Sequence, residues 1–462
     1  MNRNGPTLAH GRARRVKTPA AVGGDGPAPW LGVRPRRGAA TEAAIVELLL
    51  TRAWAAEVRR DERAAAQAEA RATLDRLVER GLAFQRSASG ERRFDPAEVT
   101  NFAIWLSLEH GDAHWSEGCV PAGRRFVWAA HGLAPRKGAC APPPPALGPR
   151  RFKVRFNRLF NLQGFAPGAP TRLRLPLPIE DAALRDLQIE ILPAPGLKVE
   201  YAMAEARLDA RLKVPASQSV ELGFEASFTA WPSGDEPASA PLDAETFALY
   251  TRPREGLIAV SEPIRRLAAD LAGDERDPWT QVERFWDFLF DRLRHGVVNY
   301  DELDPARPND WTLENGWTDC QLAAALMAAL CRARNIPARL VGGYVLDGDT
   351  PYHHYWAEAW IAERGWLPLD VTMSWNFANG GREPEWRNYY RGGLDYRMKT
   401  ERLPRLFNGA GSVRLPAACH RLAKLRDDGM ELAFYASETG ALIYREQVAI
   451  VGGDGAPARA SS

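Results

Sequence analysis

The spacing of apolar positions changes along the chain and divides it into segments. From Thr41 onward apolar residues recur at helical spacing, which predicts three short helices. The second is expected at roughly 61–80, and the third opens at Asp95-Pro96 and ends at Gly111. We therefore expect a helical accessory region at 41–135, preceded by a disordered arm at 1–40 that is rich in Gly, Pro and Arg. A Pro-rich linker is expected at 136–150, because four consecutive prolines favour extended backbone.

Between 151 and 235 the apolar period falls to two. Alternating runs include Phe152, Val154 and Phe156 near the start and Val220, Leu222 and Phe224 near the end. Such strands, separated by Pro and Gly turns, predict a β-sandwich-like domain. Helical spacing then returns, with Ser261 expected to cap one helix and Asp277-Pro278 to open the next.

The stretch from Trp317 to Thr372 combines both periods. Leu322, Leu326 and Leu330 predict a helix that ends at Asn335-Ile-Pro337, and Thr318 with Gln321 forms a capping-box pattern. Short strands are expected after it, set off by turn residues. They cover 338–346, 351–361 and 365–372.

Three side chains in this stretch suggest nucleophilic catalysis. Cys320 would lie in the first helical turn, where unpaired backbone N–H groups and the helix dipole favour a thiolate. His354 on a strand and Asp370 at the end of the next would supply a base and its orienter. Simple hairpin pairing leaves Asp370 a few residues short of His354, so we expect a bulge or strong twist there. His353 competes with His354, but strand alternation directs the two to opposite faces.

These residues resemble the transglutaminase-like superfamily, whose core is similar to that of papain-like cysteine proteases. The resemblance rests on the helix with Cys320 and on three further motifs. They are Arg334-Asn-Ile-Pro-Ala-Arg339, His354-Tyr-Trp-Ala-Glu358 and Gly365-Trp-Leu-Pro-Leu-Asp370. Bacterial members often carry an N-terminal β-domain with a segment similar to Leu175-Pro-Leu-Pro178. Thr318 stands where the family often has glycine.

The resemblance implies an α+β fold and a set of roles. The catalytic domain would be 250–410, with the cysteine helix packed on an antiparallel sheet. After it, the residue pattern itself predicts a C-terminal β-hairpin extension at 411–455, with strands at 431–435 and 441–451. Cys320 would be the nucleophile, His354 the general base and acid, and Asp370 the residue that orients the imidazole. The region between Gly380 and Leu406 is expected to be an aromatic, Arg-rich loop.

The implied reaction is acyl transfer from an amide of a peptide or protein. A thiolate would attack the carbonyl and His354 would protonate the departing amine, leaving a thioester that water or an amine resolves. The backbone N–H of Cys320 would form half of an oxyanion hole, with Trp311, Trp317 and Tyr300 as candidates for the second donor. Hydrolysis and amine transfer both stay open. The alternative from another class is a non-catalytic peptide-binding scaffold on the same fold.

Charge and composition exclude several other functions. The 60 basic and 58 acidic residues give a net charge of +2, which offers no field suited to nucleic acid or an anionic membrane. The five cysteines form no CxxC pair, so a disulfide framework or zinc ribbon is not indicated. His110, His114 and Cys119 suggest a metal, but Gly111 interrupts the helix and no fourth ligand is near. We expect no metal, no cofactor and, without a secretory signal, a cytoplasmic location.

Overall fold

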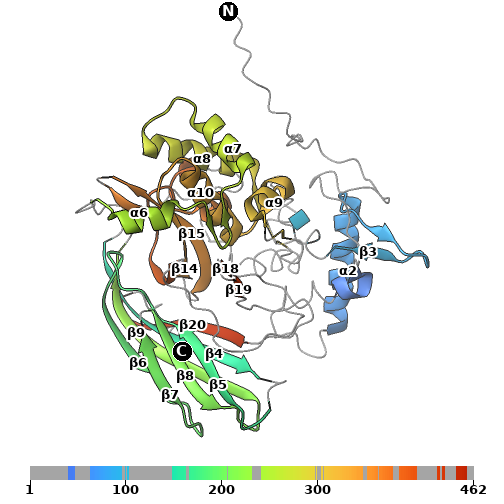
Figure 1. Ribbon diagram of the computed structural model, residues 1–462. Coiled ribbons are helices and arrows are strands. Elements are labelled where there is room, and N and C mark those ends of the chain that lie inside the picture. Colours follow the sequence, from blue (N-terminus) through green and yellow to red (C-terminus); the bar gives the residue numbers. More distant parts are fainter. Residues whose placement is uncertain are drawn as a thin grey trace, which may run out of the picture. The chain divides into compact units, whose positions relative to one another are not determined.

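The computed structural model describes a large part of the chain, and Figure 1 labels many of its helices and strands. The described residues are 40–46, 63–95, 99, 101–102, 148–162, 166–204, 206–231, 241–296, 298, 303–304, 306–346, 351–362, 364–377, 384–402, 424–426, 429–431 and 444–454. The chain divides into two compact units, the larger holding residues 138–291, 298–314 and 318–462. The arm expected at 1–40 and most of the expected linker lie outside the described residues.

The smaller unit combines a helix with a small sheet. Helix α2 (Arg63–Glu79) matches the expected second helix, and Gly81 follows it with a φ of 108°. An antiparallel sheet in the order β1-β3-β2 accompanies it, so this region is not helical throughout. Its strands are too short to give a period-two signal: β1 (Ala40–Thr41), β2 (Gln85–Arg86) and β3 (Arg92–Phe94). The expected third helix lies mostly outside the described residues.

The predicted β-sandwich is present in the larger unit. One sheet has the order β20-β4-β9-β6 and the other β5-β8-β7, and inward side chains of both share one core. The strands are β4 (Arg150–Asn161), β5 (Pro170–Pro176), β6 (Leu184–Ile191), β7 (Glu200–Ala204), β8 (Arg207–Lys213), β9 (Ser219–Ala230) and β20 (Tyr444–Gly452). Phe156 and Phe224 stack at its centre, with ring centroids 5.0 Å apart.

The C-terminal strand β20 joins the sandwich. Its expected hairpin partner, 431–435, lies almost wholly outside the described residues, and the partner that the structure describes is β4, next to it in Figure 1. Val448 and Ile450 are buried on the sandwich core, which explains the pairing. Strand β19 (Gly429–Glu431) pairs with β18 (Lys424–Arg426), and residues 432–443 are not described.

A further sheet of the larger unit, outside the sandwich, is antiparallel and has the order β16-β15-β14-β17. Its strands are β14 (Ala338–Val345), β15 (Tyr352–Ile361), β16 (Gly365–Leu369) and β17 (Arg397–Arg402). Helix α10 (Cys320–Ala333) packs on β15 and β14 with one face and on α7 (Glu262–Ala272) with the other. This sandwiched position explains why α10 is almost wholly apolar (Figure 1).

The remaining elements mostly follow their sequence signals. They are α6 (Ala244–Thr251), β10 (Arg254–Glu255), β11 (Ile258–Ala259), α8 (Pro278–Arg292), β12 (Arg294–His295), α9 (Pro308–Asn315), β13 (Trp317–Thr318), α11 (Val371–Phe377) and α12 (Pro384–Arg387). Ser261 caps α7 by accepting a hydrogen bond from the Ile264 backbone. Asp277 accepts from the Thr280 backbone as α8 begins. Both helix starts were predicted.

Two local predictions were wrong. The cap of α10 is Asp319, whose Oδ1 accepts from the Leu322 N–H at 3.0 Å, and Thr318 lies one residue outside it. The expected loop at 380–406 contains β17, paired with β14. Its charged side chains are buried against partners on neighbouring strands, so the sequence shows no apolar face.

The hydrophobic core of the sandwich continues onto strands β14 and β17 of the β16-β15-β14-β17 sheet. Tyr344 and Met398 belong to the same hydrophobic cluster as the sandwich strands, and Tyr344 meets Phe156 edge-on at 5.9 Å. Its hydroxyl donates to Glu446 Oε2 at 2.6 Å, and Glu446 also pairs with Arg158. The sandwich and the β16-β15-β14-β17 sheet are therefore held together by a shared hydrophobic core and by the buried polar contacts of Glu446. None of the helices described is long and apolar enough to cross a bilayer.

Candidate active site

Cys320 is the first residue of α10 and lies directly after the Asp319 cap. Backbone N–H groups of a helix's first turn lack intrahelical partners, so Cys320 has the dipole's positive end beside it. Its side chain is only partly buried, whereas Cys331 near the other end of α10 is fully buried. Burial raises the pKa of the Cys331 thiol to about 12, which makes that cysteine inert near neutral pH.

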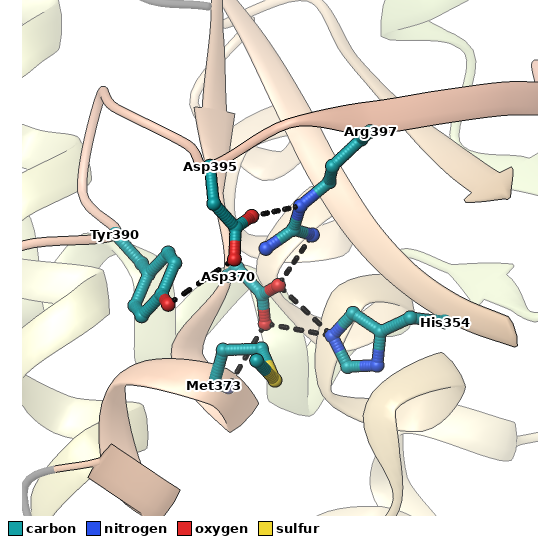
Figure 2. Close-up of polar contacts among 6 residues, drawn as sticks. All are labelled: His354, Asp370, Met373, Tyr390, Asp395 and Arg397. Atoms are coloured by element: carbon teal, nitrogen blue, oxygen red, sulfur yellow. Dashed lines mark hydrogen bonds and ion pairs between the residues drawn. The ribbon is translucent and has the colours of Figure 1, made fainter. Parts of the chain in front are cut away.

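The structure brings His354 and Asp370 together. The His354 Nε2 atom lies 2.9 Å from Asp370 Oδ2 and 3.0 Å from Oδ1, and both side chains are buried (Figure 2). Asp370 uses Nε2 of the ring, and Cys320 is near enough for its charge to raise the pKa of His354. Two of the three predicted site residues thus lie in direct contact, with the third beside them.

Of the bulge or strong twist expected between their strands, no bulge is found in the described pairing. Strands β15 and β16 pair in a regular register that ends with Ala357 opposite Leu369. Asp370 follows directly and His354 lies further along β15, so the two are diagonal neighbours. Long side chains of diagonal cross-strand residues can reach each other, and the side chains close the gap that the backbone leaves.

The neighbouring His353 has different surroundings. Its ring meets those of Tyr344 and Tyr355 edge-on, at 5.3 and 4.8 Å between centroids. Neither partner is part of the group around Asp370. This separation agrees with the alternation expected along a strand.

The His354 imidazole is held in its charged form. Burial by itself would lower the pKa of His354, but the negative charges of Asp370 and Cys320 outweigh it and raise the pKa to about 10. At neutral pH the ring is therefore an imidazolium between a carboxylate and a sulfur.

Asp370 has more partners than the imidazole. Its Oδ1 accepts from the Met373 N–H at 3.0 Å, and its Oδ2 accepts from Arg397 Nη1 at 2.6 Å. Burial would raise the pKa of this carboxyl, but the charges of His354 and Arg397 hold it well below its usual range. Sequence reasoning missed Arg397, because a charged residue in an expected loop carries no signal of burial.

A second buried charge cluster supports the same sheet. Arg339 donates to Glu358 Oε2 from Nε and Nη2 at 2.8 and 2.6 Å, and Lys399 Nζ lies 2.8 Å from Oε1. Burial would raise the pKa of Glu358, but Lys399 and Arg339 lower it to about 2. The Arg339 guanidinium also covers the Trp366 ring at 3.8 Å. The charged residues of the motifs quoted above thus hold the strands together.

Other sequence-predicted residues are placed only in part. Trp311 lies half-buried in α9, whereas Tyr300 and the side chain of Trp317 are outside the described residues. His110, His114 and Cys119 are also outside them. Within the described ranges, no group of three or more His, Cys, Asp or Glu side chains could hold a metal ion.

Comparison with known proteins finds a family and a relative that match part of this chain. The sequence model of the transglutaminase-like superfamily matches residues 265–371. A protein-glutamine gamma-glutamyltransferase from Pseudomonas aeruginosa is 30% identical over 119 residues, which are 23% of this chain and 18% of that relative. The chain therefore matches less than a fifth of that relative's length.

Two crystal structures are among those to which the chain is similar. A candidate cysteine protease from Cytophaga hutchinsonii has a TM-score of 0.40 and 16% identity, over 66% of this chain and 98% of that one. The periplasmic domain of TgpA from Pseudomonas aeruginosa has a TM-score of 0.31 and 19% identity, over 52% of this chain and 92% of that one. At such values neither likeness bears on the reaction. The segment 265–371, which holds Cys320, His354 and Asp370, is thus similar to the transglutaminase-like superfamily.

Proposed function

We propose that the protein is a cysteine-dependent enzyme that acts on amide bonds of peptides or proteins through Cys320, His354 and Asp370. The observation that carries the proposal is the buried His354 imidazole, whose Nε2 lies 2.9 Å from Asp370 Oδ2 and whose pKa is raised by the charges of Asp370 and Cys320. A scaffold needs no such charged imidazole beside a partly exposed sulfur. A cysteine nucleophile is activated by such an imidazolium, which favours the thiolate.

In the first half of the reaction, the Cys320 sulfur bonds to the amide carbonyl carbon. The backbone N–H of Cys320 donates to the developing oxyanion, a contact that contributes about 2.7–4 kcal/mol per donor in other enzymes. The carbon–nitrogen bond then breaks, and the His354 imidazolium gives its proton to the departing amine. The product is a thioester on Cys320 and a neutral imidazole.

In the second half, the neutral His354 removes a proton from water or from an amine. The activated acceptor attacks the thioester carbonyl, the carbon–sulfur bond breaks, and the thiolate–imidazolium pair is restored. Asp370 keeps the ring oriented throughout, because its carboxylate is itself fixed by Met373 and Arg397. Water gives hydrolysis and an amine gives transamidation.

The acyl donor is expected to be a peptide-bound amide. The name of the Pseudomonas aeruginosa relative makes glutamine side chains the first donors to test. The test incubates the full chain with glutamine-bearing peptides, with and without a primary amine, and measures the intact protein and its fragments by mass spectrometry.

The proposal predicts a peptide adduct on Cys320 that has lost ammonia and that disappears when an amine is added as acceptor. Cys320→Ser should form no adduct, and Cys331→Ser, the matched change in the same helix, should form it normally. An adduct that survives in Cys320→Ser, or ammonia release that is unaffected by that change, would contradict the proposal. A folded protein that never acquires an adduct on Cys320 would favour the scaffold.

A further inference from the structure

Arg397 is a buried cation that the proposed reaction does not use directly. It lies on β17, and its side chain is 2% exposed. One end of its guanidinium, Nη1, donates to Asp370 Oδ2 at 2.6 Å, and Nε donates to Asp395 Oδ1 at 2.8 Å (Figure 2). The flat face covers the Trp356 ring at 4.7 Å. The guanidinium is thus fixed at its two polar edges and on one face.

The Asp370 carboxylate is therefore shared between two cations. Its Oδ2 lies 2.9 Å from His354 Nε2 and 2.6 Å from Arg397 Nη1. A carboxylate whose only cationic partner is an imidazolium stabilises that imidazolium with its full negative charge. Here part of that charge is neutralised from the opposite side.

We propose that Arg397, held in place by Asp395, is a positioning residue that fixes the Asp370 carboxylate and limits the basicity of His354. The inference rests on the proposed function, because a limit on basicity matters only if His354 transfers protons. An imidazolium that is held less tightly gives its proton to a departing amine more readily. Burial of the guanidinium against Trp356 strengthens the effect, because charges interact more strongly away from water.

The ionisable groups around His354 make the signs of the effects predictable. Asp370 follows β16, Cys320 begins α10, and Arg397 with its partner Asp395 comes from β17 and the segment before it. Tyr390 donates to Asp395 Oδ2 at 3.4 Å. Loss of the Asp395 charge leaves Arg397 uncompensated, so the pKa of His354 should fall. Loss of Arg397 together with Asp395 returns the whole Asp370 charge to the imidazolium, so the pKa of His354 should rise.

The experiment is a nuclear magnetic resonance titration of the full chain labelled with ¹⁵N-histidine. The His354 signal is identified by its absence in His354→Gln, and the midpoint of its titration is compared among variants. We expect Asp395→Asn to lower the midpoint by about one pH unit and Arg397→Gln/Asp395→Asn to raise it by a similar amount. Arg397→Lys keeps the charge and should stay closest to the unmodified protein.

Arg332→Gln is the matched control for loss of a buried arginine. Arg332 pairs with Glu255 at 2.7 Å at the far end of α10, so this variant should lose stability without moving the His354 midpoint. Midpoints that stay together in all variants, or that move in the same direction in Asp395→Asn and in the double variant, would overturn the inference. The titration needs no substrate. An active enzyme with unmoved midpoints therefore refutes only the role of Arg397, and an inactive one with shifted midpoints refutes only the proposed function.

Discussion

Asp370 is the residue on which the charges of the candidate site converge. Its two oxygens accept hydrogen bonds from His354, Arg397 and the Met373 backbone, and its carboxyl is almost completely buried. A buried carboxylate is costly unless every lone pair is used, so this position has little tolerance for change.

Asp370→Asn tests that dependence. Without the carboxylate, burial acts on His354 with less opposition, and the pKa of His354 should fall from about 10 towards or below its ordinary value. The imidazolium is then lost at neutral pH, and ammonia release from a glutamine peptide should fall about 10²–10⁴-fold. Asp277→Asn, the same substitution at the exposed start of α8, should leave the rate unchanged. A rate within a few-fold of normal in Asp370→Asn would count against an orienting role.

Some of the individual residues of the candidate site can be predicted from the sequence, and others cannot. Cys320, His354 and Asp370 could be named because each lies within a motif, and Cys320 and Asp370 also lie near a predicted element boundary. Arg397 and Asp395 could not, because their importance depends on burial beside Asp370, which neither a period nor a motif encodes. The choice of Asp319 over Thr318 as cap depends on one residue of register, which a capping pattern leaves open.

At the scale of elements, the sheet beside α10 is held by buried ion pairs as well as by apolar contacts. Glu358 on β15 joins Arg339 on β14 and Lys399 on β17, so one carboxylate links three strands. Lys399 also reaches Asp181 at 2.9 Å, in the segment between β5 and β6. These pairs explain why β17 was not predicted as a strand, since its inward residues are charged.

Glu358→Gln should break this link at a large cost. Removing one member of a buried ion pair costs about 3–5 kcal/mol, because the partners keep uncompensated charges. The pKa of Glu358 is lowered from 4.5 to about 2, so its stabilisation is fully present above pH 4.5 and is lost as the pH falls towards about 2.

Urea denaturation of both proteins between neutral and acid pH measures the difference. The difference in unfolding free energy between the unmodified protein and Glu358→Gln should be largest near neutral pH. It should become smaller as the pH falls from 4.5 towards about 2. Glu262→Gln, at an exposed position on α7, serves as the control and should track the unmodified protein. A gap that stays constant down to the lowest pH would refute the role given to Glu358.

At the scale of the whole molecule, the larger unit joins sequence segments that are far apart. Strand β20 completes the sandwich beside β4, although nearly three hundred residues separate Arg158 from Glu446, which pair across it. The Tyr344 hydroxyl meets the same Glu446 from β14. Periodicity predicted a strand at this end of the chain but not its partner, because pairing between distant strands leaves no local signal.

Glu446→Gln should weaken the link between the sandwich and the sheet that carries His354. Arg158 is 3% exposed, so losing its carboxylate partner should lower the free energy of unfolding by about 3–5 kcal/mol. Gln447→Ala, at an exposed position of the same strand, should change it by less than about 0.5 kcal/mol. Equal denaturation midpoints for the two variants would show that the link carries no stability.

The account rests on a sulfur made reactive by a charged imidazole, and the rate at which iodoacetamide labels Cys320 measures this directly. At near-neutral pH, peptide mapping should find Cys320 alkylated much faster than the buried Cys331. The substitution His354→Gln should lower the alkylation rate of Cys320 by about tenfold or more. Alkylation of Cys320 no faster than that of Cys331, or at the same rate with and without His354, would contradict the account.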